Sequence, residues 1–266
     1  MSLPRGNESI VRKEFKKQAK GFSNPKLTIN SEELLHWVRS SLNLNAGMTV
    51  LDVAAGTGIL SRSIAPFVQH VTSIDLSQNM INEGKILNTR LNIANIDFML
   101  GHAEEIPCAN GSFDLAVSRL AFHHFTNPMK VLHEMCRVSK LSGSVCVVDM
   151  ISPENDGLCK LYNHYERLRD PSHTTALKKS EFEHLFNQLD LEIQVIETLD
   201  VPVHVSRWLE LTDTDAETTG DIIRDIELEL ETGNVVTGLF PYVENEEMMF
   251  RQKWIKIIGK RIHSEL

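Results

Sequence analysis

The sequence predicts an α/β protein whose mostly parallel sheet is covered by helices on both faces. Over the first 150 residues, short strand-like runs alternate with amphipathic helical patterns. The last of these runs, at 144–150, is rich in β-branched residues, which suits a strand buried on both faces. Strands that alternate with helices in this way form parallel sheets. The length of 266 residues fits one large domain, or one domain with a small appendage.

The expected elements of this first part follow one another closely along the chain. Ser31 can cap the first helix, and Ser77 can cap a later one, because a serine hydroxyl accepts from the free N–H groups of a helix start. The predicted strands span residues 49–55, 70–75, 96–101, 112–119 and 144–150. The predicted helices span residues 31–42, 59–67, 77–88 and 129–140.

The pattern changes after Met150. Residues 151–180 look helical and irregular, and an amphipathic helix is expected at 181–189. A long strand is expected at 191–205, interrupted at Pro202 because proline cannot donate to a strand ladder. The predicted remainder is an acidic helical stretch at 207–235 and a closing strand at 250–262.

Composition narrows the classes of partner and of location. The net charge of −9 argues against a nucleic-acid partner, which would favour a basic surface. No apolar run is long enough for a membrane span, and the N-terminus lacks the apolar core of a secretory signal. The four cysteines show no C-x-x-C spacing, so reduced thiols in a cytoplasmic protein are expected.

A glycine turn follows the first predicted strand, where the chain reads VLDVAAGTGILSRSIA. Glycines between a strand and a helix let the backbone approach a ligand, and the helix start offers unpaired N–H groups. Dinucleotide-binding proteins carry a third glycine here, whereas this chain has Ser61 after Gly56 and Gly58. The turn by itself is equally compatible with a cofactor site and with a tight structural turn.

Two acidic residues near the turn distinguish between cofactors. Asp75 ends the second predicted strand, where a carboxylate can accept from both ribose hydroxyls of NAD or of S-adenosylmethionine. Asp52 lies beside the glycine loop, so its charge would repel a pyrophosphate and attract an ammonium group. S-adenosylmethionine carries that ammonium group and NAD does not, so the pair favours S-adenosylmethionine.

Several linked motifs carry a resemblance to a known family. They read VLDVAAGTG, SIDLSQNM, GHAEEIPCANGSFDLAVS and RVSKLSGSVCVVD, and together they cover residues 45–152. In order and spacing this region resembles class I S-adenosylmethionine-dependent methyltransferases, in particular the group of the ubiquinone/menaquinone methyltransferases. The resemblance implies a Rossmann-like seven-stranded, mostly parallel sheet whose last strand runs antiparallel, with helical insertions that cover the acceptor.

The resemblance also implies roles for residues of the first two motifs. Asp52 and the backbone of Ala54 would bind the methionine end of the cofactor. Gly56 and Gly58 would lie against it, and Asp75 would hold the ribose.

Further cofactor contacts are implied around the adenine. Leu76 and Met80 would flank the ring, and His102, Ala103 and Glu104 would meet its edge. His102 stands where the family usually has Asp, so a bond to the adenine amino group would need an imidazole nitrogen as acceptor.

An aromatic residue of the N-terminal segment is a further candidate. Phe22 is placed to cover the cofactor, with a plain core contact as the alternative.

The stretch SRLAFHHFTNP comes at the end of the fourth predicted strand. In the family that this chain resembles, the residues at this place face the methyl group of the cofactor. Arg119, His123 and His124 are the catalytic candidates, since one histidine can act as a base near neutral pH. The alternative is that a histidine only packs or caps the following helix. A metal site with Cys136 lacks recognisable ligand spacing, so no metal is predicted.

Polar residues are dense in YERLRDPSH, within the first stretch after the fifth strand. Tyr165, Arg167, Arg169 and His173 are candidates for acceptor binding, in which an arginine grips an anionic group such as a carboxylate. The alternative is that Asp-Pro-Ser forms only a turn and a helix cap.

These observations predict one organisation for the whole chain. The N-terminal helix covers the site, the α/β core binds the cofactor, two insertions cover the acceptor, and the rest completes the sheet. The corresponding ranges are 1–30 for the cover helix, 31–152 for the core, 153–180 and 205–243 for the insertions, and 181–204 and 244–266 for the remainder.

The predicted function is methyl transfer from S-adenosylmethionine to a small molecule or to a small peptide or natural product. A carboxylate or hydroxyl oxygen is the preferred acceptor atom because of the His and Arg candidates. No nucleic-acid or membrane partner is expected, and the sequence does not determine the oligomeric state. Two alternatives remain: a nicotinamide-dependent oxidoreductase, and a non-catalytic protein that binds S-adenosylmethionine.

Overall fold

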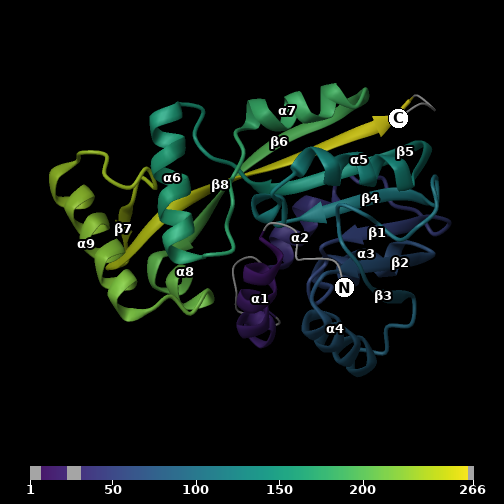
Figure 1. Ribbon diagram of the computed structural model, residues 1–266, viewed down its shortest axis with the longest axis horizontal. Helices are drawn as coiled ribbons and strands as arrows, with labels where there is room; N and C mark the ends of the chain where they lie inside the picture. The colour runs from purple at the N-terminus through teal and green to yellow at the C-terminus, as the bar shows by residue number, and fades with distance from the viewer. Residues whose placement is uncertain (1–6, 23–30, 263–266) are drawn as a thin grey trace.

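The fold was analysed in a computed structural model that describes residues 7–22 and 31–262, without the side chains of 18–22. A twisted sheet lies between helices on both of its faces (Figure 1). Its strand order is β3-β2-β1-β4-β5-β8-β6, and a short β7 pairs with β8 outside this path. The strands span Thr49–Val53 (β1), His70–Asp75 (β2), Ile96–Leu100 (β3), Phe113–Arg119 (β4), Ser139–Met150 (β5), Leu191–His204 (β6), Tyr242–Glu244 (β7) and Glu247–Arg261 (β8).

Strand directions agree with the predicted sheet. Strands β1 to β5 pair in parallel, whereas β8 runs antiparallel to both β5 and β6. The predicted seven-stranded arrangement with an antiparallel last strand is therefore confirmed, with β7 as a short addition.

Helices pack on both faces because successive strand residues point to opposite sides. Val50 of β1 joins the core beneath α2 and α3, whereas Leu51 joins the core beneath α5 and α7. The helices span Glu8–Phe22 (α1), Glu32–Arg39 (α2), Ile59–Ile64 (α3), Gln78–Arg90 (α4), Pro128–Val138 (α5), Asp156–Arg169 (α6), Lys179–Gln188 (α7), Val205–Leu211 (α8) and Ala216–Thr232 (α9), with 3₁₀ turns at Ala65–Phe67 (η2) and Phe122–His124 (η3).

A long antiparallel ribbon extends the sheet into a second lobe. Strand β8 pairs with β5 only as far as Trp254, and its earlier residues pair with β6 and β7. In Figure 1, α6, α8, α9 and β7 surround this end of the ribbon, at the left. Most of this lobe is built from the chain after Met150, where the sequence pattern changes.

One detail of the sequence prediction is wrong in this lobe, and another becomes more precise. Strand β6 is not interrupted at Pro202, which pairs with Arg251 within the ladder. Because β6 is the last strand of its path, it tolerates a residue without an N–H group. The acidic stretch 207–235 forms two helices, because Asp215 accepts from the N–H groups of Glu217 and Thr218 and starts α9 afresh.

Within the described residues, no helix combines the length and the apolar character that crossing a bilayer requires.

Candidate functional site

A cleft opens at the carboxyl ends of the parallel strands, which is where α/β sheets bind ligands. The loops after β1, β2, β3 and β4 form one wall, and helix α1 forms the opposite wall. The sequence-predicted residues that line this cleft are Asp52, Ala54, Gly56, Asp75, Leu76, Met80, His102, Ala103, Glu104, Arg119 and His124. The fold thus brings together candidates that are spread over 70 residues of chain.

The two glycines of the first loop do different things. Gly56 has a φ of 57°, lines the cleft, and donates its N–H to Oδ2 of Asp75 at 2.7 Å. Gly58 has a φ of 79°, and a Cβ there would lie 2.7 Å from the ring of Phe98. The cleft lining includes Gly56 but not Gly58, so Gly58 serves packing in this structure.

Asp75 connects the loops that follow β1 and β2. While Oδ2 accepts from Gly56, Oδ1 accepts from the N–H of Ser77 at 2.8 Å. Burial raises the pKa of Asp75, although these two backbone bonds oppose the shift. Each carboxylate oxygen can accept a second hydrogen bond, so Asp75 retains acceptors for a ligand's hydroxyl groups.

Asp52 accepts a hydrogen bond from a buried serine. The hydroxyl of Ser61 donates to Oδ2 of Asp52 at 2.5 Å and lies 2.7 Å from the hydroxyl of Ser73. Burial raises the pKa of Asp52 to about 6, and the Ser61 bond and the charge of Arg119 oppose this rise. In the sequence Ser61 is notable only as the place of a missing glycine, and its contact with Asp52 was not predicted.

His102 connects the loop after β3 to the N-terminal helix. Its Nδ1 accepts from the N–H of Glu104 at 3.1 Å, so the ring proton is on Nε2, which lies 2.8 Å from a carboxylate oxygen of Glu8. Both ring nitrogens of His102 therefore have protein partners in this structure.

Helix α1 supplies an aromatic ring to the cleft. The Phe22 side chain lies outside what the structure describes, whereas Phe15 lines the cleft. Arg12 donates to the carbonyl of Leu76 at 2.8 Å and holds the helix to the loop after β2. Val11 and Phe15 stand four residues apart, and this apolar spacing is a sequence signal that could have indicated the cleft-facing side of α1.

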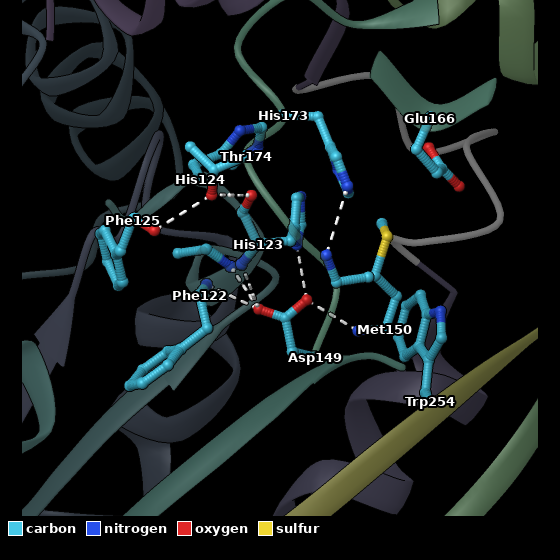
Figure 2. Close-up of polar contacts among 12 residues, drawn as sticks. Phe122, His123, His124, Phe125, Asp149, Met150, Glu166, His173, Thr174 and Trp254 are labelled. Atoms are coloured by element: carbon cyan, nitrogen blue, oxygen red, sulfur yellow. Dashed lines mark hydrogen bonds and ion pairs between the residues drawn. The ribbon is translucent and has the colours of Figure 1, made fainter. Parts of the chain in front are cut away.

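A buried carboxylate organises the turn that carries the histidine pair (Figure 2). Oδ2 of Asp149 accepts from the N–H groups of Ala121 and Phe122, at 3.1 and 2.6 Å, while Oδ1 lies 2.5 Å from Nδ1 of His123. Burial opposes charge on His123, but the nearby carboxylates, Asp149 first, raise its pKa. Asp149 was not among the predicted site residues, because its contacts span 26 or more positions of sequence.

The two histidines face different surroundings. His124 lines the cleft, and His123 is not among the lining residues. Burial, followed by the charge of His123, lowers the pKa of His124 to about 4. The structure thus provides a neutral imidazole at the cleft. Arg119 lies in the same wall, and burial lowers its pKa to about 10, so it stays cationic at neutral pH.

None of the four candidates for acceptor binding is among the described residues that line the cleft. Tyr165 donates to Asp225 at 2.7 Å, and Arg167 donates to the carbonyl of Thr174 at 3.0 Å. Arg169 pairs with buried Glu166, and His173 stacks on His123. Their roles toward an acceptor stay predictions.

In the described part of the chain, no group of three or more His, Cys, Asp or Glu side chains is arranged to hold a metal ion.

Comparison with known proteins gives the family. Residues 51–147 match the model of a methyltransferase domain. An uncharacterised methyltransferase of Bacillus subtilis, YcgJ, is 31% identical over 209 residues, which are 79% of this chain and 82% of the relative. The chain belongs to the class I S-adenosylmethionine-dependent methyltransferases.

Further similarities agree with a methyltransferase. The crystal structure of YcgJ superposes with a TM-score of 0.79 at 27% identity and covers 88% of this chain and 100% of its own. A demethylmenaquinone methyltransferase of Listeria monocytogenes is 29% identical over 188 residues, 68% of this chain and 79% of the relative. The similarity to YcgJ and its structure extends well beyond the matched domain.

Proposed function

We propose that this methyltransferase transfers the methyl group of S-adenosylmethionine to a hydroxyl oxygen of a small molecule, with His124 as general base. The observation that carries the proposal is a neutral imidazole in the same cleft as the loop around Gly56 and Asp75. A base in that position can remove the proton that a hydroxyl acceptor must lose.

The proposed cofactor site uses one end of the cleft. Asp75 would accept from the ribose hydroxyls, with Leu76 and Met80 on either side of the adenine. Asp52, Ala54 and Gly56 would meet the methionine end. The support is that all of these residues line one continuous cleft and that Asp75 retains free acceptor positions.

The adenine edge would meet the backbone of Ala103, together with His102 and Glu104. The bonds that His102 makes to Glu104 and Glu8 favour a positioning contact over a direct bond to the adenine amino group.

The reaction defines what the acceptor side must do. A C–S bond breaks, its electron pair stays on sulfur, and a C–O bond forms in line with it, while the acceptor O–H proton passes to His124. A carboxylate acceptor has already lost its proton, so a neutral base supports a hydroxyl acceptor more strongly. Arg119, a cation in the same wall, would stabilise negative charge that develops on the acceptor oxygen.

The proposal is tested with methyl-labelled S-adenosylmethionine and a panel of phenols, enols and carboxylic acids. Demethylmenaquinone, the acceptor in the name of several relatives, belongs in the same panel. Label should appear in a hydroxyl acceptor, and His124→Gln should lower kcat by about 100-fold. The affinity for S-adenosylhomocysteine should stay within about twofold, since the base does not bind the ribose or the methionine end.

Two results would contradict the proposal. Full activity of the His124→Gln variant would remove the base from the mechanism. Tight binding of S-adenosylhomocysteine with no transfer to the whole panel would favour the non-catalytic alternative.

A further inference from the structure

The segment that follows α6 forms hydrogen bonds to the turn that carries His123 and His124. The N–H and the hydroxyl of Thr174 each donate to the carbonyl of His123 at 2.8 Å, and the hydroxyl also reaches the carbonyl of Phe125 at 3.0 Å. Arg167 in turn holds the carbonyl of Thr174. Figure 2 shows Thr174 beside these turn residues. Residues of the polar cluster at 165–174 therefore hold the turn after β4 in place, although none of them is among the described residues that line the cleft.

Within this segment, Ser172 presents two oxygens to Nδ1 of His124. The carbonyl oxygen lies 3.0 Å from Nδ1, and the hydroxyl oxygen lies 3.2 Å from it. The carbonyl can only accept. The same carbonyl also accepts from the side-chain amide of Asn7, at 2.6 Å, so the start of α1 and His124 share one anchor.

The direction of the hydroxyl is set by Asp170. Oδ1 of Asp170 lies 2.5 Å from the Ser172 hydroxyl and 2.9 Å from the Ser172 N–H. Burial opposes ionisation of Asp170, but attraction to the protonated form of His124, the charge of Arg169 and the two bonds from Ser172 lower its pKa. With His124 neutral, Arg169 and the Ser172 bonds still favour a carboxylate, which only accepts. The Ser172 hydroxyl must therefore donate to Asp170, which leaves only a lone pair for His124.

Both oxygens around Nδ1 of His124 thus require a proton on that nitrogen. We propose that Asp170 and Ser172 are positioning residues that fix the tautomer of His124, with the proton on Nδ1 and the lone pair on Nε2. This inference rests on the proposed function, in which Nε2 takes the acceptor's proton. The resulting imidazolium would keep its Nδ1–H bond to Ser172, and the carboxylate of Asp170 would stabilise its charge.

Other groups around His124 do not fix the tautomer by themselves. His123 from η3 and Asp149 from β5 act on its charge, and Phe15 from α1 meets its ring edge-on, with the centroids 5.1 Å apart. None of these contacts determines which ring nitrogen carries the proton. The two oxygen atoms of Ser172 determine that the proton is on Nδ1.

The test is the tautomer of His124 in the complex with S-adenosylhomocysteine, read from the ring ¹⁵N shifts and their proton couplings at pH 7. The wild-type protein should show a protonated Nδ1 and an unprotonated Nε2. In Asp170→Ala the hydroxyl of Ser172 is released and can donate to Nδ1, so the Nε2–H tautomer should appear. Asp170→Asn keeps an acceptor oxygen and should keep the wild-type tautomer.

A double variant separates this role from simple support of the fold. Asp170→Ala with Ser172→Ala leaves only the carbonyl at Nδ1, so the wild-type tautomer should return. A purely structural role predicts the same spectrum for the single and the double variant. Ser180→Ala is the matched control, because its hydroxyl also bonds a carboxylate, Glu154 at 2.6 Å, on the surface.

Three results would overturn the inference: a wild-type His124 protonated on Nε2, an unchanged tautomer in Asp170→Ala, or no return in the double variant. None of these readouts needs an acceptor or turnover. Failure of the proposed function would instead show as full activity of His124→Gln with the tautomer as expected. With an active acceptor, Asp170→Ala should also lower kcat about tenfold, with the S-adenosylhomocysteine affinity unchanged.

Discussion

At the residue scale, two carboxylates hold the loops of the cleft: half-buried Asp75 and buried Asp149. Asp75 accepts from two backbone N–H groups on two loops, and Asp149 caps the turn before α5 in the same way. A carboxylate that accepts several N–H bonds stabilises a loop more than a neutral acceptor does, because each of its hydrogen bonds is charge-assisted. Both residues therefore shape the site, and Asp75 also lines the cleft itself.

The first prediction concerns Asp75. Asp75→Ala should raise the Kd for S-adenosylhomocysteine by tenfold or more, about 1.4 kcal/mol, because it removes the ribose acceptors and frees the Gly56 and Ser77 amides. Titration calorimetry measures this. Asp97→Ala is the control, since that side chain lies exposed on β3, and it should bind like the wild type. Equal affinities in both variants would contradict the proposed ribose site.

The second prediction concerns pH. The pKa of His124 is lowered to about 4 in the folded state, against about 6.5 when unfolded, so the unfolded chain binds more protons between these values. The unfolding free energy should fall as pH drops from 6.5 to 4, by up to about 1.4 kcal/mol per pH unit from this group. His123, with its raised pKa, contributes in the opposite direction and loses its stabilisation as pH rises.

Urea unfolding at several pH values measures this dependence. His124→Gln removes the group, so its stability should fall less steeply below pH 6.5. His164→Gln, an exposed histidine on α6, should follow the wild-type curve. Parallel curves for all three proteins would show that His124 does not titrate as described.

Single residues divide into those that the sequence revealed and those that only folding revealed. Asp52 and Asp75 could be predicted because each stands at the end of a strand, beside the glycine loop. Ser61 and Asp149 could not, since their partners lie 9 and more than 25 residues away and carry no local pattern. The residues at 165–173 could be identified from the sequence as a polar cluster. Which partners they bond to depends on how α6 packs against the neighbouring elements.

At the scale of elements, close packing of α4 on β3 fixes one side of the cleft. Gly84 of α4 lies against the ring of Phe98, and a Cβ there would also come within 2.8 Å of the Thr57 carbonyl. The close approach holds the loop after β1 between the helix and the strand. Gly58 meets the same ring from the loop side.

The third prediction follows from this contact. Gly84→Ala should destabilise the protein by about 1–3 kcal/mol, because neither the ring nor the carbonyl can move without disturbing the loop. Gly220→Ala is the matched control: it lies inside α9, and a Cβ there would meet no atom within 4 Å. That variant should be neutral or more stable by up to about 1 kcal/mol. Urea unfolding of both variants decides, and equal stabilities would contradict the packing described.

Element prediction was best where the periodicity was local. The run at 70–75 formed β2 with the expected bounds, since a short apolar run between turn residues has few alternatives. The predicted interruption at Pro202 was wrong because a strand can include proline when it is an edge strand. That β6 is an edge strand is a property of the whole sheet.

At the scale of the molecule, the two lobes are joined by a buried polar network along the ribbon. Gln252 of β8 receives the indole N–H of Trp254 at 2.8 Å and donates to Glu166 of α6 at 3.1 Å, and Arg169 completes the network on Glu166. Arg119 of the cleft lies over the ring of Trp254. The second lobe is thus connected to the cleft by side chains as well as by the strands.

The fourth prediction concerns the cover formed by α1. Binding of S-adenosylhomocysteine should slow hydrogen exchange in residues 8–17, because α1 lines the cleft and is tied to Leu76 by Arg12. Arg12→Ala should lose part of this protection and bind more weakly. Arg224→Ala, which removes an exposed pair on α9, should match the wild type. Exchange in α1 that does not respond to the ligand would show that the helix does not cover the cofactor.

The central claim is that one cleft holds both the cofactor and the base. A crystal structure of the complex with S-adenosylhomocysteine tests it most directly. In that complex the ribose hydroxyls should bond to Asp75, and Nε2 of His124 should face the space in front of the sulfur. A cofactor bound outside this cleft, or a His124 ring turned away from the sulfur, would contradict it.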